Sequence, residues 1–332
     1  MRRWAAVLLA VAGVAPPAAA QAPATLFHHH PVALPSPNAF PQLGWRLHLQ
    51  QRAPYEARVT TARELVLVAA AGFDGSRSAS LTAWAPLLAD GWRLRARAEA
   101  GRDARFGWFG LGNDAAKDDG LVTESAPHWY RVRHTRYAAG AEVTRRVVGR
   151  LQLAAGAGLS RTEWQGLPGA TLFEAELPGG LDEDDATGRL ALVWDSRDRE
   201  YGGPRRGLLL EAGVLAGSGG DGYTRGWAHL RGWLPVGGRT VLAGRAVAAD
   251  LGGEPTLDAR ALLPVWEGEL TVLGGPTSYR GADTPRWLGT GLLLANAEVR
   301  VDVFDRGDFG GVSLVAFADG GRVFEGEGLR LT

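Results

Sequence analysis

The chain has 332 residues, including 47 glycines and 12 tryptophans, and its 36 basic side chains balance 36 acidic ones. Because the sequence contains no cysteine, a disulfide framework, a thiolate metal site and a cysteine nucleophile are excluded. Zero net charge disfavours a general nucleic-acid binder, and a hydrophobic content of 45% is too high for a disordered chain.

Residues 1–20 have the features of a signal peptide. Arg2 and Arg3 precede an apolar run from Trp4 to Val14, and small residues lead up to Ala20, where we place the cleavage site. No later stretch of about 18 uninterrupted apolar residues exists, so the mature chain has no predicted membrane-spanning helix. If the exported chain crosses a membrane, it must do so with strands.

Residues 21–43 are rich in proline, and we predict that they form a linker. Three consecutive histidines, His28 to His30, lie within this stretch. Adjacent residues in a flexible segment cannot fix a coordination geometry, so we predict no metal site there. We expect the folded domain to cover residues 44–332.

From there the dominant pattern is a period of two, which places alternate side chains on opposite faces of a strand. Between Trp92 and Gly101, one face carries Trp92, Leu94, Ala96, Ala98 and Ala100, and the other carries Arg93, Arg95, Arg97 and Glu99. Similar alternation recurs near residues 79–87, 151–162, 189–195 and 208–216. The sequence is therefore predicted to be all-β.

The strand lengths and connections favour an antiparallel outer-membrane β-barrel over a soluble sandwich. The periodic segments run to about ten residues, the length needed to cross a bilayer at a tilt. One face is aliphatic with tryptophan near the ends, and the other is rich in Gly, Ser, Arg and Glu. Long connections at about 104–127, 164–186 and 251–287 alternate with short turns, as external loops alternate with periplasmic turns. We predict eleven strands between residues 63 and 324, and one or two more from residues 43–56.

The last two predicted strands place a pair of acids inside the barrel. In the strand from Gly291 to Phe304, the valines and alanines face lipid and Glu298 faces the lumen. In the following strand Asp319 faces inward by the same alternation. Two acids in a partly dehydrated lumen need a cation between them.

At this point three segments resemble a known family: Tyr279-Arg280-Gly281, Ala297-Glu298-Val299-Arg300 and Phe317-Ala318-Asp319-Gly320-Gly321. They are similar to the barrel of the bacterial surface antigen superfamily, the BamA/TamA group of outer-membrane assembly factors and their relatives in two-partner secretion. The resemblance implies a sixteen-stranded barrel whose sixth external loop folds back into the lumen.

The resemblance also implies a structural latch, in which Arg280 bonds Glu298 and Asp319. The supporting motif positions are Tyr279, Gly281, Phe317 and Gly321. A guanidinium presents a planar fork of donors suited to carboxylates, which agrees with this role. The alternative is that residues 278–281 form an ordinary surface turn and the acids merely line a wet pore.

The ends of the chain depart from the family's pattern. Residues 21–43 are too short for a POTRA-type periplasmic domain of the kind that receives client chains in the assembly factors. After Phe324 the sequence offers no closing strands, so we expect a fragment whose barrel is not closed in this chain, because an open edge in lipid exposes unpaired backbone groups.

These features predict a protein of the bacterial outer membrane that aids the insertion or translocation of polypeptides. The alternative is a passive pore or a structural barrel without assembly activity. We expect as partners outer-membrane lipid, lipopolysaccharide and unfolded outer-membrane or secreted polypeptides, and neither nucleic acid nor a cofactor. Scattered histidines and serines (His128, His134, His229, Ser160 and Ser196) show no catalytic spacing, so we predict no enzyme.

Overall fold

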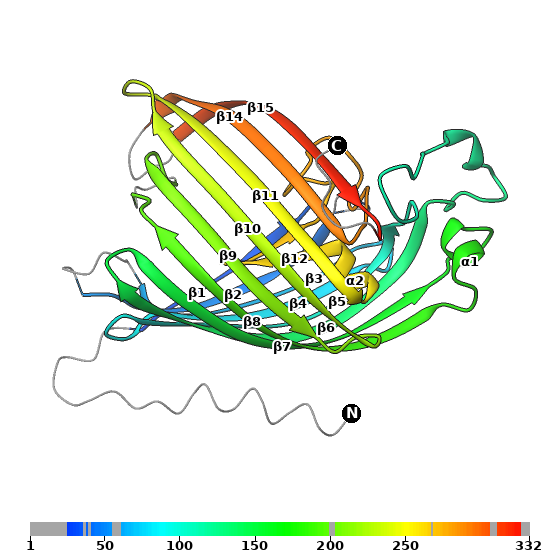
Figure 1. Cartoon of the computed structure of the whole chain (residues 1–332), viewed down its shortest axis with the longest axis horizontal. Helices are drawn as coiled ribbons and strands as arrows, with labels where there is room; N and C mark the ends of the chain where they lie inside the picture. Colours follow the sequence, from blue (N-terminus) through cyan, green and yellow to red (C-terminus); the bar gives the residue numbers. More distant parts are fainter. Residues whose placement is uncertain are drawn as a thin grey trace.

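The chain forms one large antiparallel sheet that curves around a central lumen (Figure 1). The computed structural model describes residues 25–35, 38, 41–54, 61–198, 203–266, 268–305 and 311–326. Within these ranges the sheet has thirteen strands, each paired with its neighbour in the chain except where β11 pairs with β14 across a long loop. That loop carries a separate two-stranded hairpin, β12–β13.

The strands of the main sheet and the elements between them have the following bounds: β1 Thr25–Leu34, β2 Gln42–Arg52, β3 Thr61–Ala71, β4 Arg77–Ala89, β5 Trp92–Gly107, β6 Arg131–Val148, β7 Leu151–Gln165, α1 Leu172–Glu176, β8 Leu181–Asp195, β9 Gly207–Gly217, β10 Gly222–Pro235, β11 Thr240–Glu254, α2 Leu257–Ala261, β12 Leu262–Val265, β13 Gly268–Thr271, β14 Gly291–Asp305 and β15 Gly311–Phe324.

The predicted fold class is confirmed, and so is the count of eleven strands between residues 63 and 324 for the main sheet. The eleven strands expected between residues 63 and 324 are β3 to β11, β14 and β15, and β2 is the strand expected from residues 43–56. Among the described strands, β1 and β15 each pair on one side, so the sheet is not closed on itself.

The prediction of a linker over residues 21–43 is wrong for residues 25–34, which form β1. This strand pairs with β2 from Thr25 opposite Gln51 to Leu34 opposite Gln42. Its proline, Pro31, is tolerated because β1 lies at the edge of the sheet, where a missing backbone N–H need not break a ladder bond. The barrel wall therefore includes residues 25–34 and does not start at residue 44, while the predicted signal peptide, residues 1–20, lies outside the described residues.

The predicted alternation of faces is also confirmed. On β8 and β9 the outward side chains of Leu190, Leu192 and Leu208 are each about half exposed, whereas Val193 and Glu211 point inward and are fully buried. Burying only every second residue leaves a continuous apolar outer wall, the arrangement that a lipid-facing barrel requires. The inward side chains pack against the long loop that carries α2, β12 and β13.

Long loops gather at one end of the barrel, at the right of Figure 1, and short turns lie at the other end. The turn between β4 and β5 is closed by Gly91, whose φ of 71° lies in the left-handed region that glycine adopts without strain. At the loop end, an apolar cluster joins three loops through Trp108, Phe173, Leu257 and Leu288. The loops are thus packed against one another.

One predicted loop is shorter than expected. The sequence predicts an external loop over residues 164–186, but β8 begins at Leu181, so the acidic run Asp182 to Asp185 belongs to a strand. Period-two alternation did not reveal this because every residue of the run is charged. Arg161 of β7 pairs with Asp182 at 3.1 Å and with Asp184 at 3.3 Å, which offsets the repulsion between these acids.

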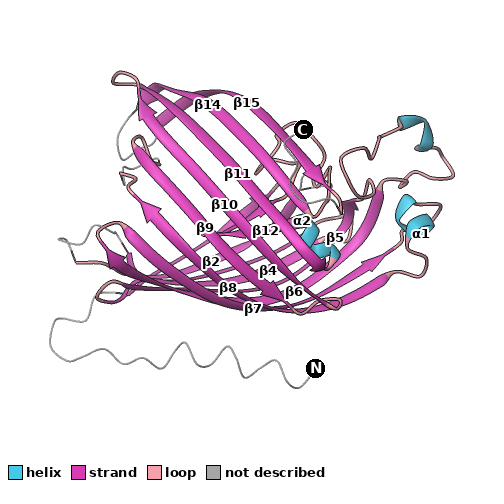
Figure 2. Cartoon of the chain, viewed as in Figure 1, coloured by secondary structure: helices cyan, strands magenta, loops and turns pink. Residues whose placement is uncertain are grey.

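Helix is confined to short turns of the loops (Figure 2). The helices α1 and α2 have five residues each. In the part of the chain that the structure describes, no helix is long and apolar enough to cross a membrane.

Candidate functional site

The connection between β11 and β14, residues 255–290, enters the lumen, and we call it the lumen loop. Its helix α2 and hairpin β12–β13 lie inside the curved sheet (Figure 1). Val265, Leu270 and Leu273 of this loop are almost fully buried against inward side chains of the barrel wall. Burial of this apolar surface holds the loop inside the barrel.

The structure brings together the three residues of the predicted latch. Arg280 donates from Nε to Oδ2 of Asp319 at 2.9 Å and from Nη2 to Oδ1 of Asp319 at 2.6 Å. Its Nη1 donates to Oε1 of Glu298 at 2.5 Å, and its backbone N–H donates to Oδ2 of Asp319 at 2.9 Å. One guanidinium of the lumen loop therefore bridges an acid of β14 and an acid of β15.

Two polar neighbours complete this arrangement. Asn296 donates from Nδ2 to Oδ1 of Asp319 at 2.6 Å and to the carbonyl oxygen of Ser278 at 2.7 Å. Arg300 donates from Nε to Oε2 of Glu298 at 2.7 Å. The side chain of Asp319 is only 3% exposed, so its charge depends on these donors in place of water.

The supporting motif residues take different positions. Phe317 lies under Arg280, with the guanidinium carbon 3.8 Å from the ring centroid, a cation–π arrangement. Tyr279 packs against Trp287, with 5.7 Å between the ring centroids, and so contacts the loop. Gly281 has a φ of 87°, which a residue with a side chain adopts only with strain. Gly321 faces Leu273 of the lumen loop.

Arg280 remains charged at any physiological pH. Its hydrogen bonds to Asp319 raise the pKa of the guanidinium above its usual range, and this effect exceeds the opposing effect of burial. The contact is therefore a permanent ion pair, and it has no pH switch near neutrality.

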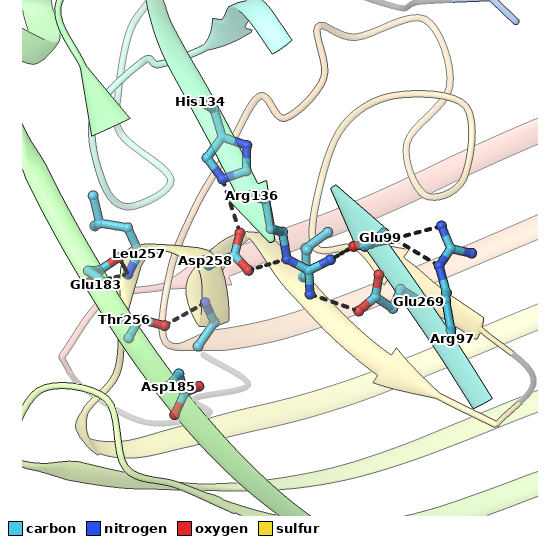
Figure 3. Close-up of polar contacts among 12 residues, drawn as sticks. Arg97, Glu99, His134, Arg136, Glu183, Asp185, Thr256, Leu257, Asp258 and Glu269 are labelled. Atoms are coloured by element: carbon cyan, nitrogen blue, oxygen red, sulfur yellow. Dashed lines mark hydrogen bonds and ion pairs between the residues drawn. The ribbon is translucent and has the colours of Figure 1, made fainter. Parts of the chain in front are cut away.

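A second anchor of the lumen loop, which no sequence motif indicates, is shown in Figure 3. Arg136 of β6 donates from Nε to Oδ2 of Asp258 in α2 at 2.8 Å. It also pairs with Glu99 of β5 and, at 3.2 Å, with Glu269 of β13. His134 lies 3.3 Å from Asp258 on the other side. Both α2 and β13 are thus held by β6, on the side of the barrel away from β14 and β15.

The charge of Asp258 is stabilised by these neighbours. Burial alone would raise the pKa of Asp258, but the charge of Arg136 and the contact with His134 outweigh burial and lower this pKa. The capping hydroxyl of Thr256 accepts a hydrogen bond from the backbone N–H of Ala259 at 3.1 Å, which fixes the start of α2. Glu183 of β8 accepts from the N–H of Leu257 at 3.1 Å.

A third anchor uses buried charges of the central strands. Arg225 of β10 donates to the carbonyl oxygens of Leu262, at 2.7 Å, and of Ala259. Glu211 of β9 accepts from the backbone N–H of Trp266 at 2.8 and 2.9 Å, and its side chain has no exposed surface. Residue spacing could not have predicted these contacts, because they join side chains to the backbone of an irregular loop.

Two histidines that were considered for catalysis belong to these anchors. His134 contacts Asp258, and His229 lies 3.9 Å from Glu211 while accepting a hydrogen bond from Arg231 at 3.2 Å. The site as a whole is a set of ion pairs and hydrogen bonds between a loop and a wall. Its evident chemical capacity is to hold the loop in place.

A glycine pair on β15 allows a matched test of how closely the loop packs. A Cβ atom added at Gly321 would lie 2.6 Å from Cδ1 of Leu273 and 3.1 Å from the carbonyl oxygen of Leu293. At Gly320, which faces outward, an added Cβ meets nothing within 4 Å. We expect Gly321→Val to lower the free energy of unfolding by about 1–3 kcal/mol, and Gly320→Val to leave it nearly unchanged, in urea titrations of the detergent-solubilised protein. Equal effects of the two changes would contradict this packing.

The fold is similar to that of a solved outer-membrane barrel. The structure of BamA from Haemophilus ducreyi lacking POTRA domains 1–3 aligns with a TM-score of 0.52 at 14% identity, covering 91% of this chain and 58% of that chain. CdiB from Acinetobacter baumannii aligns with a TM-score of 0.43 at 11% identity, covering 92% of this chain and 56% of that chain. This chain thus spans somewhat more than half the length of either structure.

A search among curated proteins finds no match. The model of the Omp85 superfamily domain matches residues 65–330, which is most of the chain and includes the latch residues of the lumen loop, β14 and β15. The chain therefore belongs to the Omp85 superfamily, and it is a β-barrel protein of the bacterial outer membrane.

Proposed function

We propose that this protein aids the insertion or translocation of polypeptides at the outer membrane, and that Arg280, Glu298 and Asp319 act as its structural latch. The observation that carries the proposal is the position of Arg280, held between two acids of β14 and β15 by the lumen loop. Its proposed partners are unfolded outer-membrane or secreted polypeptides, together with outer-membrane lipid and lipopolysaccharide.

The filled lumen argues against the alternative of a passive pore. The lumen loop is anchored to β6, β9, β10, β14 and β15, and the loops at the external end share an apolar cluster. A pore with steady conductance needs a continuous aqueous path, whereas side chains of this loop occupy the central lumen.

Deletion of the gene tests the proposal. We expect lower levels of folded outer-membrane or secreted proteins in the deletion strain, measured by quantitative proteomics of outer-membrane and culture fractions, and restoration by the intact gene. Conductance of the purified protein in planar bilayers is the companion measurement, and we expect little. Unchanged protein levels together with steady ion conductance would favour a pore and contradict an assembly role.

A further inference from the structure

Three arginines lie close together at the connection between β6 and β7, at the end of the barrel where the short turns gather (Figure 1). Arg145 and Arg146 belong to the last residues of β6, Arg150 lies in the turn that follows, and all three are exposed. We call these three residues the arginine turn. Short turns of outer-membrane barrels face the periplasm, so the arginine turn lies at the periplasmic surface of the membrane.

Arg145 belongs to the lipid-facing side of the wall. In the strand register it is paired with Trp92 of β5 on one side and with Leu153 of β7 on the other. Trp92 and Leu153 are outward, partly exposed residues, and residues paired directly across neighbouring strands share one face of the sheet. The guanidinium carbon of Arg145 lies 4.9 Å from the centroid of the Trp92 ring, so a cation–π contact keeps this charge beside the apolar wall.

Two described acids lie beside the arginine turn, and neither pairs with it. The backbone N–H of Arg146 donates at 2.8 Å to a carbonyl oxygen of the turn between β4 and β5, where Asp90 forms no ion pair with a described residue. The backbone N–H of Asp195 donates to the carbonyl oxygen of Arg150 at 3.3 Å, but the carboxylate of Asp195 is engaged by Arg197 at 2.9 Å. Within the described ranges the three arginines form no ion pair, so the turn presents positive charge at the membrane surface.

Apolar side chains lie between these cations. Val147 and Val148 are 58% and 66% exposed. Val148 is paired in the register with Leu151, and Leu151 is paired with Trp194, an outward residue of β8. Tryptophans and exposed aliphatic residues at the end of a barrel wall are typical of the boundary between hydrocarbon and lipid headgroups. The arginine turn is therefore at the level of the headgroups.

From this arrangement we infer that the arginine turn binds the headgroup phosphate of an anionic phospholipid, phosphatidylglycerol, in the periplasmic leaflet. The apolar stem of an outward arginine lies along the wall while its guanidinium reaches the headgroup layer. There a phosphate accepts charge-assisted, bidentate hydrogen bonds from the guanidinium, and the acyl chains of the same lipid cover Trp92 and Val148. The excess of positive charge favours a lipid with net negative charge over a zwitterionic one.

The inference names a site for the lipid partner proposed above. It rests on the place of the protein in the outer membrane and not on the proposed role in polypeptide insertion. A failure of lipid binding would therefore leave the result of the gene deletion unaffected, and the reverse also holds.

Native mass spectrometry of the purified, detergent-solubilised protein tests the inference. The probes are phosphatidylglycerol and zwitterionic phosphatidylcholine with identical acyl chains. We expect phosphatidylglycerol to bind more tightly, and we expect this preference to decrease as the salt concentration rises, because salt screens exposed charges. Equal binding of the two lipids would overturn the inference. Binding of a capped hexaglutamate peptide without a preference for phosphatidylglycerol would also overturn it, because the partner would then be an acidic polypeptide.

Single substitutions link the preference to the arginine turn. We expect Arg145→Gln and Arg150→Gln each to weaken the binding of phosphatidylglycerol by about fivefold, because each arginine near an anionic lipid adds an attraction of this size. Arg145→Lys keeps the charge, so it should weaken binding less than Arg145→Gln.

Arg239→Gln is the matched control. Arg239 is exposed in the short turn between β10 and β11, at the same end of the barrel, and Arg205 beside that turn is already paired with Asp302. This change should leave the affinity for phosphatidylglycerol unaltered. All of these variants should keep the parent's unfolding midpoint. Equal weakening by Arg145→Gln and Arg239→Gln would overturn the inference.

Discussion

Replacing Arg280 by alanine should lower the free energy of unfolding by about 3 kcal/mol, because it leaves the carboxylates of Asp319 and Glu298 without the cation that compensates them. Asp319 is nearly inaccessible to solvent, so water can replace the lost donors only by entering the packed loop. Unfolding in urea, followed by tryptophan fluorescence, would measure the loss.

Arg280→Lys is the informative control for this variant. Lysine keeps the positive charge but cannot donate to both oxygens of Asp319 and to Glu298 in the same planar geometry. We expect a loss of stability intermediate between the parent and Arg280→Ala. If both variants unfold at the same urea concentration as the parent, Arg280 does not stabilise the barrel.

Replacing Arg136 by alanine should have an effect of similar size on the opposite wall, again about 3 kcal/mol. This change removes the cation shared by Asp258, Glu99 and Glu269, and it leaves His134 as the contact between β6 and Asp258 of α2 (Figure 3). We expect trypsin to cleave the lumen loop at Arg260 faster in this variant than in the parent, because a loosened loop is open to proteolysis.

Arg133→Ala on the same strand is the control for Arg136→Ala. Among the described residues, the side chain of Arg133 makes one hydrogen bond, an exposed one to Gln165 at 3.5 Å, so its loss should change the free energy of unfolding by less than about 0.5 kcal/mol. Equal stability and equal cleavage rates in the two variants would show that the anchor of Figure 3 does not hold the loop.

Period-two alternation could predict the wall of this barrel because residues that face lipid are apolar, whereas the alternate residues that face the lumen are small or polar. The same rule placed Glu298 and Asp319 inside the barrel, since the two strands are neighbours in sequence and pair directly. The alternation rule failed for β1, because polar residues and Pro31 interrupt the aliphatic face of this strand. The composition of the segment is therefore similar to that of a linker.

Period-two alternation could not predict the structure of the lumen loop. Its arginine was found only through a resemblance between short motifs, because an irregular loop follows no repeating pattern of side-chain directions. The contact between Arg136 and Asp258 spans 122 positions, and no local spacing indicates which acid in a long loop will meet which strand. Such contacts depend on the path of the loop, which packing of the whole lumen determines.

A double-mutant cycle with Arg280→Ala and Asp319→Ala tests most directly whether the lumen loop is fixed to the barrel wall. Residues that share a buried ion pair should show a coupling energy, so the double variant should lose about 2 kcal/mol less than the sum of the two single losses. Losses that add to within about 0.5 kcal/mol would mean that the two side chains do not interact, which would contradict the latch.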